Sequence, residues 1–488
     1  MGTSTALPRA AAHLRDEKKV VLFIAALGSF LTPFDTSAVN IALPTIGNDF
    51  MLDAITLGWI STAYLLASAV FLVPFGKLGD LYGRKKVFLA GIGLFATTSF
   101  VISLSFDPAM IITLRFVQGI GSAMIFGTSL AMLTSVFPRE ERGKAIGITI
   151  MCVYLGLSLG PTLGGYMTDI LGWRSIFWVN VPLGIIVIAM TLHYLTGEWK
   201  DPAGGKFDLA GALIYGISLS SLTYGLSLGP VPAALGFLVL AGAGVAFFVY
   251  YELKVPWPVL EIRLFSGNRV FTFSNLAALI NYSATFAVTF LMSLYLQFGK
   301  GFSAEYAGLI LVAQPLTQAI FAPLAGRLSD RIEPRVIATI GMTLTAIGLF
   351  SLTFLSVDTM LVFIVGSLLF LGMGFGLFSS PNTNAIMSSV SPRYYGIASG
   401  MVGTMRLVGQ MLSMGVAMMV FAAVIGSVQI TPEKIPEFMT SVHFSFTIFF
   451  LLCVFGIFAS LVRGNMNRTG PGGGNEPPSS PAGNAKRV

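Results

Sequence analysis

The sequence GKLGDLYGRKK at residues 76–86 connects two long apolar runs that contain no charged residue. Its three glycines permit a tight turn and a close approach of neighbouring helices. Asp80 and Arg84 are four residues apart, so they can pair with each other or with adjacent helix ends. A related stretch, GRLSD at residues 326–330, follows another apolar run 250 residues later. The two stretches together predict a duplicated arrangement of helices around this loop.

Composition places the apolar runs in a membrane. Of the 488 residues, 55% are hydrophobic and 10% are charged, whereas soluble domains have about 25% charged residues. Soluble globular, coiled-coil, collagen-like and disordered folds are therefore excluded for most of the chain. A membrane-spanning helix needs about 20 apolar residues, whereas a barrel would show shorter alternating segments. The expected spans are fourteen, at residues 20–44, 55–75, 87–106, 108–132, 145–168, 175–196, two between 208 and 252, 271–297, 304–325, 336–356, 359–382, 396–425 and 441–462.

The basic residues predict the orientation of these spans. If the N-terminus is cytoplasmic, 24 of the 29 Lys and Arg residues lie in cytoplasmic segments and three lie outside. This bias predicts a multi-pass protein of the cell membrane with both termini in the cytoplasm. It also accounts for the net charge of +7, and the scattering of the basic residues argues against nucleic acid as a partner.

The repeat predicts the domain organisation. We expect a cytoplasmic tail, a six-helix bundle, two inserted helices, a second six-helix bundle and a disordered cytoplasmic tail. Their boundaries are 1–19, 20–196, 207–252, 270–463 and 464–488. Parallel repeats of this kind occur in transporters whose two halves rock around a central site, and we expect such a chain to function as a monomer.

Five stretches support a family resemblance. The loop at 76–86 resembles the G-x-L-x-D-R-x-G-R-[KR]-x loop of the major facilitator superfamily, with Tyr82 beside the position where the family often has Arg. Three stretches within spans, FDTSAVNIALP (34–44), LRFVQGIG (114–121) and GLSLGPTLGG (156–165), resemble segments of its fourteen-helix drug:proton antiporter branch, and WRSIFWVNVP (173–182) is typical of one branch.

The resemblance implies a major facilitator fold and a role in multidrug efflux and drug resistance. It assigns a cytoplasmic gating role to the loop residues Gly76, Asp80, Gly83, Arg84 and Asp330. It also implies a hinge, or a seal against proton leakage, in the antiporter helix motif of Gly156, Gly160, Pro161 and Gly164. The glycines recur every four residues and so share one helix face that another helix can approach closely.

Asp35 is the acidic residue that lies well inside an expected span. A charge at the bilayer centre costs about 2.5–3.5 kcal/mol, so a functional role is the default hypothesis. A buried carboxyl group that holds either a proton or a cation can exchange one for the other. The alternative is a structural Asp that is hydrogen-bonded to Thr36 or Asn40.

Arg115, inside another span, is always charged and cannot carry the proton itself. It can instead change the pKa of an acidic partner. Gln118 lies three residues further along the chain, on the same helix face. We therefore predict that Asp35, Asn40, Arg115 and Gln118 couple protons to substrate. A structural role for Arg115 stays open, and for Arg406 a functional and a structural role are both open.

We hypothesise that the protein is a proton-coupled antiporter that exports amphipathic compounds. We expect these compounds to be cationic. The alternative within the same fold is a carrier of an endogenous metabolite, by export or symport. An integral membrane enzyme would need a cluster of His, Cys, Asp or Glu at one membrane face, and none is visible in the sequence. A channel is disfavoured by the two-half repeat. The sequence has no metal-ligand spacing and no phosphate-binding loop, so we expect no metal, no cofactor and only small molecules, protons and the bilayer as partners.

Overall fold

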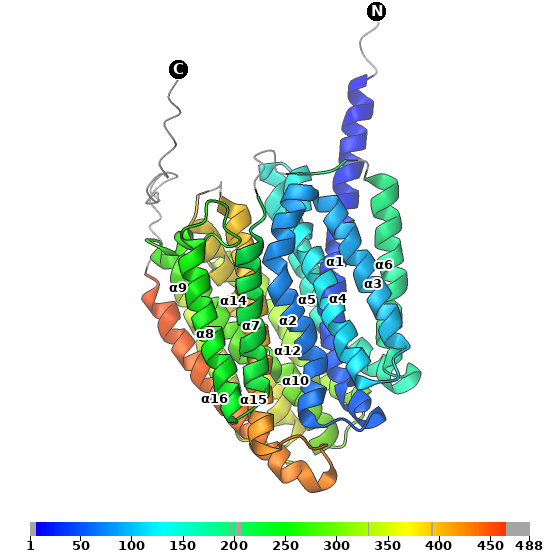
Figure 1. Ribbon diagram of the computed structural model, residues 1–488, viewed down its shortest axis with the longest axis vertical. Helices are drawn as coiled ribbons and strands as arrows, with labels where there is room; N and C mark the ends of the chain where they lie inside the picture. The colour runs from blue at the N-terminus through cyan, green and yellow to red at the C-terminus, as the bar shows by residue number, and fades with distance from the viewer. Residues whose placement is uncertain (1–5, 196, 201–205, 330, 392–393, 465–488) are drawn as a thin grey trace, which may run out of the picture.

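The computed structural model describes residues 6–195, 197–200, 206–329, 331–391 and 394–464 (Figure 1). Within these ranges the regular structure is helical, and 14 helical spans are long and apolar enough to cross a membrane. The predicted all-α membrane fold with fourteen spans is therefore confirmed. Residues 465–488 of the expected C-terminal tail and the loop residue Asp330 lie outside the described residues.

The first half of the chain contains α1 (Ala6–Asp49), α2 (Ala54–Tyr82), α3 (Arg84–Ser103), α4 (Pro108–Val136), α5 (Arg139–Leu171) and α6 (Arg174–Tyr194). Polar residues fix several helix starts. The Asp53 carboxylate accepts hydrogen bonds from two backbone N–H groups at the start of α2, and Asp107 caps α4 ahead of Pro108. The helix α1 begins well before its membrane span, which starts at Lys18.

The inserted helices are α7 (Leu209–Ser227) and α8 (Pro232–Glu252). The second half contains α9 (Arg269–Thr285), α10 (Ala287–Leu294), α11 (Ala304–Leu311), α12 (Ala313–Ser329), α13 (Pro334–Leu352), α14 (Leu361–Ser388), α15 (Tyr395–Val424) and α16 (Ile435–Val462), with short turns η1 (Ile262–Phe265), η2 (Tyr295–Gly299) and η4 (Pro432–Lys434). Two spans of this half are interrupted, because α9, α10 and η2 make one span and α11 and α12 make another.

The packing of the second half repeats that of the first. In the first half α1 packs on α5 and α6, α2 on α4, and α3 on α4 and α6. In the second half α9 packs on α15 and α16, α12 on α14, and α13 on α14 and α16. Each pair in one half thus has its counterpart in the other, as expected of a duplicated six-helix unit.

Two matching contacts join the halves. The helix α5 packs against α11, and α15, its counterpart, packs against α2. The inserted helix α7 pairs with α8 and lies against α2 and α15. The start of α1 and the end of α16 lie at the same end of the molecule (Figure 1), which we call the terminal end; the other is the opposite end.

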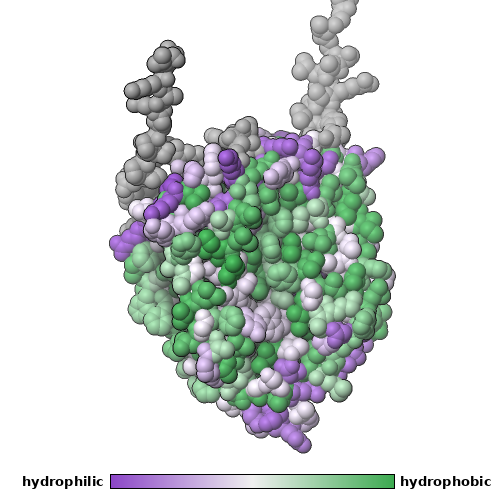
Figure 2. Space-filling model, viewed as in Figure 1, coloured by the Kyte–Doolittle hydropathy of each residue, from purple (hydrophilic) through white to green (hydrophobic). Residues whose placement is uncertain are grey.

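The surface has the character of a membrane protein. On the face drawn in Figure 2, hydrophobic residues cover most of the middle and hydrophilic residues gather at the two ends. Many large apolar side chains on the outer helices are exposed, among them Phe247 in α8 and Phe455 in α16. So large an exposed apolar surface is stable against lipid tails and not against water.

Candidate functional site

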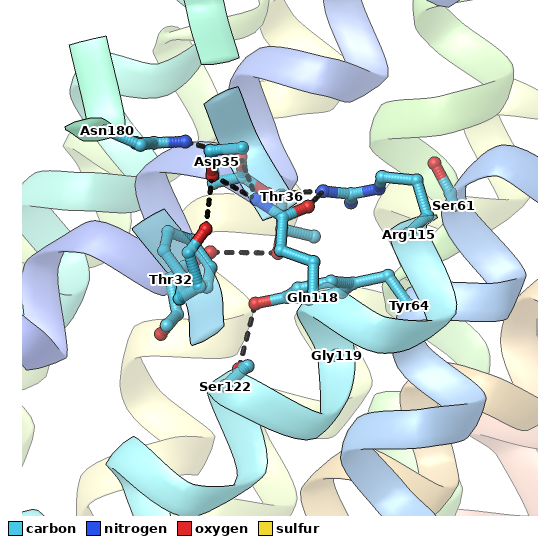
Figure 3. Close-up of polar contacts among 12 residues, drawn as sticks. Thr32, Asp35, Thr36, Ser61, Tyr64, Arg115, Gln118, Gly119, Ser122 and Asn180 are labelled. Atoms are coloured by element: carbon cyan, nitrogen blue, oxygen red, sulfur yellow. Dashed lines mark hydrogen bonds and ion pairs between the residues drawn. The ribbon is translucent and has the colours of Figure 1, made fainter. Parts of the chain in front are cut away.

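The centre of the first half contains a fully buried ion pair. Asp35 in α1 and Arg115 in α4 both have side chains with no exposed surface. The Arg115 Nη1 atom lies 2.5 Å from Asp35 Oδ2 (Figure 3). The two residues are 80 positions apart, so the packing of α4 against α1 brings them together. A buried pair of this kind is strongly destabilised when one partner is removed, because the other charge stays uncompensated.

Two amides complete the surroundings of the carboxylate. The Asn180 Nδ2 group, from α6, donates to Asp35 Oδ1 at 2.8 Å, and the Gln118 Nε2 group donates to the same oxygen at 3.3 Å. Gln118 also donates to the Ser99 hydroxyl in α3 at 2.8 Å. The carboxylate is therefore held by three donors from α4 and α6.

The guanidinium of Arg115 has further partners. Its Nη1 group also donates to Gln118 Oε1 at 2.5 Å, and its Nε group donates to the Ile60 carbonyl in α2 at 3.3 Å. The Tyr64 ring, also in α2, lies 4.3 Å from the guanidinium carbon. The Arg115 Nη2 group has no hydrogen-bond partner among the described residues. Arg115 thus has two acceptors besides Asp35, the Gln118 side chain and the Ile60 carbonyl.

Asn40 does not join this cluster. Its Oδ1 atom accepts a hydrogen bond from the Ser61 hydroxyl at 2.7 Å, and no hydrogen bond between described residues links it to Asp35. The cluster does include two residues that our sequence analysis did not propose, Asn180 and Tyr64. Asn180 lies in the quoted stretch at 173–182, where an amide inside an apolar span was the available signal.

Residues 76–86, which we expected to form a connecting loop, are helical except for Gly83, because α2 continues to Tyr82 and α3 begins at Arg84. The loop at 76–86 is therefore a tight corner between two helices at the terminal end, where it also contacts α4. Arg84 Nη2 lies 2.7 Å from Asp80 Oδ1, and Arg84 Nη1 donates to the Ala131 carbonyl at 3.1 Å and to the Ser135 hydroxyl at 2.5 Å. Gly83 has a φ of +124°, which favours glycine.

Two of the three glycines at 76–86 allow close packing. A β-carbon at Gly83 would lie 2.5 Å from the Glu198 carboxyl carbon, and one at Gly79 would lie 2.8 Å from Thr128 Cγ2 in α4, whereas one at Gly76 would make only an ordinary contact at 3.7 Å. The loop therefore fixes the α2–α3 turn to the end of α4.

The glycines of α5 face α1. A β-carbon at Gly156 would lie 2.6 Å from the Phe30 carbonyl oxygen, one at Gly160 would lie 2.5 Å from Ser37 Cβ, and one at Gly164 would lie 2.8 Å from Ala38 Cβ. This face thus packs on the segment of α1 that contains Asp35. The Pro161 carbonyl, on α5, lies against Gly308 of α11, so the same helix contacts both halves.

Comparisons with known proteins agree with this architecture. A family model described as the Major Facilitator Superfamily matches residues 25–414. The chain is 33% identical to the riboflavin transporter RibZ of Clostridioides difficile (strain 630), over 80% of this chain and 85% of that protein. It is 32% identical to the multidrug resistance protein Stp of Mycobacterium tuberculosis (strain CDC 1551 / Oshkosh), over 83% and 76%.

A third relative is the tetracenomycin C resistance and export protein of Streptomyces glaucescens, 30% identical over 88% of this chain and 80% of that protein. Among solved structures, a bacterial homolog of the human lysosomal transporter Spinster, inward-facing and unoccupied, covers 92% of this chain and 97% of its own, with a TM-score of 0.65 and 17% identity. A D-xylose-proton symporter covers 91% and 96%, also with a TM-score of 0.65, at 14% identity.

Proposed function

The chain belongs to the major facilitator superfamily of membrane transporters, and from that premise we propose that it exports amphipathic small molecules in exchange for protons. The observation that carries the proposal is the buried Asp35–Arg115 pair. Relatives named for drug resistance and antibiotic export support the direction of transport. Their family is one of transporters and not of enzymes, so the alternative of an integral membrane enzyme is set aside.

The proton is exchanged at Asp35. When a proton binds Asp35 Oδ2, an O–H bond forms and the carboxylate loses its charge, so the ion pair with Arg115 is broken. Gln118 Oε1 still accepts from Arg115 Nη1 and keeps the guanidinium in place. Each proton that moves inward across 100 mV supplies about 2.3 kcal/mol, which the carrier can use to move substrate outward.

Alternating access follows from the two halves. We take the bundles at 20–196 and 270–463 as the two moving bodies, and from the positive-inside bias we infer that both termini lie in the cytoplasm and the protein in the cell membrane. At the opposite end, the Ala54 N–H donates to the Val428 carbonyl at 3.1 Å and Gln297 Nε2 donates to the Ile41 carbonyl at 2.8 Å. The halves are thus in contact at the end that faces outside.

The terminal end is more open. A β-carbon at Gly147 of α5, or at Gly396 or Gly400 of α15, would meet nothing within 4 Å. These are matching helices of the two halves. Under this topology we take the described state to be inward-facing. We assign the loop at 76–86 to gating on the cytoplasmic side, and the α5 motif at 156–165 to a hinge that transmits changes at α1 to α11.

Cationic compounds are the expected substrates only if Asp35 also binds them. In the described state Arg115 already neutralises Asp35, so a cation would have to displace the guanidinium to reach the carboxylate. A second candidate function is transport of an endogenous metabolite, which the similarity to a riboflavin transporter favours.

The experiment that tests the proposal uses the full chain in proteoliposomes with an imposed pH gradient. A panel of amphipathic compounds, including riboflavin, is added on the side of the membrane that has the lower proton concentration. Proton movement across the membrane is followed with an internal pH dye. We expect amphipathic compounds to move protons in the opposite direction. Exchange with riboflavin alone would favour the metabolite function, and movement of protons with the substrate would exclude antiport.

A further inference from the structure

We propose that the site between the two halves binds an amphipathic organic anion, and that Arg406 binds its acidic group. This inference rests on the proposed export function and names the substrate class for it. The relevant residues, which we call the interface cluster, are Phe126, Tyr154, Tyr282, Phe375, Ser379 and Arg406. They come from α4, α5, α9, α14 and α15 and therefore from both halves.

Arg406 lies deep within a span. It is eleven residues after the start of α15 at Tyr395, which corresponds to about 16 Å along the helix. A charge at this depth costs about 2.5–3.5 kcal/mol unless a partner compensates it. Arg115, which also lies inside a span, has Asp35 as that partner.

Arg406 has no such partner in the part of the chain that the structure describes. Among the described residues its guanidinium makes no ion pair and no hydrogen bond, and its one ring contact is with Phe126 of α4, whose centroid lies 5.0 Å away. The side chain is partly exposed. A guanidinium has five N–H donors in a planar fork that matches a carboxylate. These donors are available to a ligand that enters between the halves.

The rest of the interface cluster supplies aromatic surface and hydroxyl groups. The rings of Tyr282 and Phe375 meet edge to face with centroids 5.4 Å apart. The hydroxyl groups of Tyr154 and Ser379 lie 3.0 Å apart and join α5 to α14 across the two halves. Tyr282 also packs on α15 one helical turn from Arg406, because a β-carbon at Gly409 would lie 2.7 Å from Tyr282 Cβ. An aromatic body with one acidic group is complementary to this set.

The sign of the fixed charge selects an anion. The helices α4, α9, α14 and α15 contain no Asp or Glu, and the acidic residues of α5 lie in its first and last turns. Asp35, in α1, is neutralised by Arg115. A cationic ligand would thus meet an unpaired guanidinium and no free carboxylate, whereas a carboxylate would compensate the charge of Arg406.

The test compares three ligands built on one aromatic skeleton. They are 1-pyrenebutyrate, its neutral methyl ester and the cationic 4-(1-pyrenyl)butylamine, and their binding to the purified full chain in nanodiscs is measured by fluorescence anisotropy. We expect the anion to bind wild type about tenfold more tightly than the ester, as for a hydrogen-bonded charge pair. Arg406→Gln should remove this preference while ester binding stays within about twofold, and Arg406→Lys should retain part of it because the charge is kept.

Arg269→Gln is the matched control. Arg269 also lies over a phenylalanine ring, that of Phe273 at 5.9 Å, but at the exposed start of α9. It should leave the binding of all three ligands unchanged. Unchanged anion binding in Arg406→Gln, or tighter binding of the amine than of the anion by wild type, would overturn the proposal.

Exchange assays on the same three ligands separate this inference from the export function. If the ester or the amine exchanges for protons in wild type and the anion neither binds nor exchanges, the anion site is refuted while proton-coupled export stands. If no amphipathic compound exchanges for protons but Arg406→Gln abolishes the tight binding of the anion, the anion site stands and proton-coupled export is refuted.

Discussion

Asp35 Oδ2 and Arg115 Nη1 lie 2.5 Å apart between α1 and α4, and neither side chain has any exposed surface. Asp35 is therefore shielded from the aqueous phases in the described state, and its charge is balanced by one specific partner. A carrier that exchanges protons at this carboxylate must alternate between a paired and an unpaired state of Arg115. The following predictions rest on that relationship.

Replacing Arg115 should destabilise the folded protein, because the Asp35 carboxylate then has no counter-charge. Arg115→Gln leaves Asp35 buried without its counter-charge, so we expect the free energy of unfolding to fall by about 3–5 kcal/mol. The double variant Asp35→Asn/Arg115→Gln removes both charges and should recover most of that stability, without recovering exchange. Thermal unfolding of the purified variants measures the first effect. A double variant no more stable than Arg115→Gln would show that the pair is not the source of the loss.

Asn180 should matter more for coupling than Asn40. Asn180 donates to Asp35 Oδ1 at 2.8 Å, whereas Asn40 bonds Ser61. Asn180→Ala removes a donor to a buried charge, worth about 1.5–3 kcal/mol, so we expect proton-coupled exchange to slow by about tenfold. Asn40→Ala is the matched control, and initial exchange rates in proteoliposomes make the comparison. Equal losses in the two variants would assign Asn180 no special part in coupling.

Closure at the opposite end should depend on Gly308. A β-carbon there would clash with the Pro161 carbonyl, and backbone atoms cannot move aside cheaply. Gly308→Ala should therefore weaken the α5–α11 contact and shift the population toward separated halves. Spin labels at Met51 and Met360, which are both exposed in loops at this end, report the distance by electron–electron double resonance. Gly236→Ala, with no neighbouring atom within 4 Å, is the control, and a distance distribution in Gly308→Ala equal to that of the control contradicts the prediction.

The loop at 76–86 should stabilise one conformational state. Arg84 bonds Asp80, Ala131 and Ser135, so Arg84→Gln removes contacts that join the α2–α3 turn to α4. We expect exchange to slow by about tenfold, measured as above. Lys86→Gln removes an exposed charge from the same loop and should have little effect. If the two variants exchange equally fast, the loop has no gating role.

Much of the fold could be predicted from the sequence, because apolar length and the placement of charges determine which segments cross a membrane. The similar stretches at 76–86 and 326–330 indicated a duplication within the chain. The helix contacts of the second half, which match those of the first, agree with it. Asp35, Arg115 and Gln118 could be proposed singly, because a polar residue is costly inside a span. The structure places all three in direct contact.

Contacts between distant helices could not be predicted. Asn180 reaches Asp35 across 145 residues, and only the packing of α6 on α1 brings them together. Asn40 is five residues after Asp35, which turns an α-helix by about 140°, so the two side chains point to different neighbours. That Arg406 of α15 lies over the Phe126 ring of α4, with no ion pair among the described residues, is likewise a property of the packing between the halves.

The most direct test of proton coupling is proton release by the purified protein on substrate binding. A compound that wild type exchanges is added to unbuffered protein, and the pH change is recorded. We predict that wild type releases protons, that Asp35→Asn binds the compound and releases none, and that Asp107→Asn, which alters an exposed helix cap, behaves as wild type. Proton release from Asp35→Asn equal to that of wild type would contradict the account.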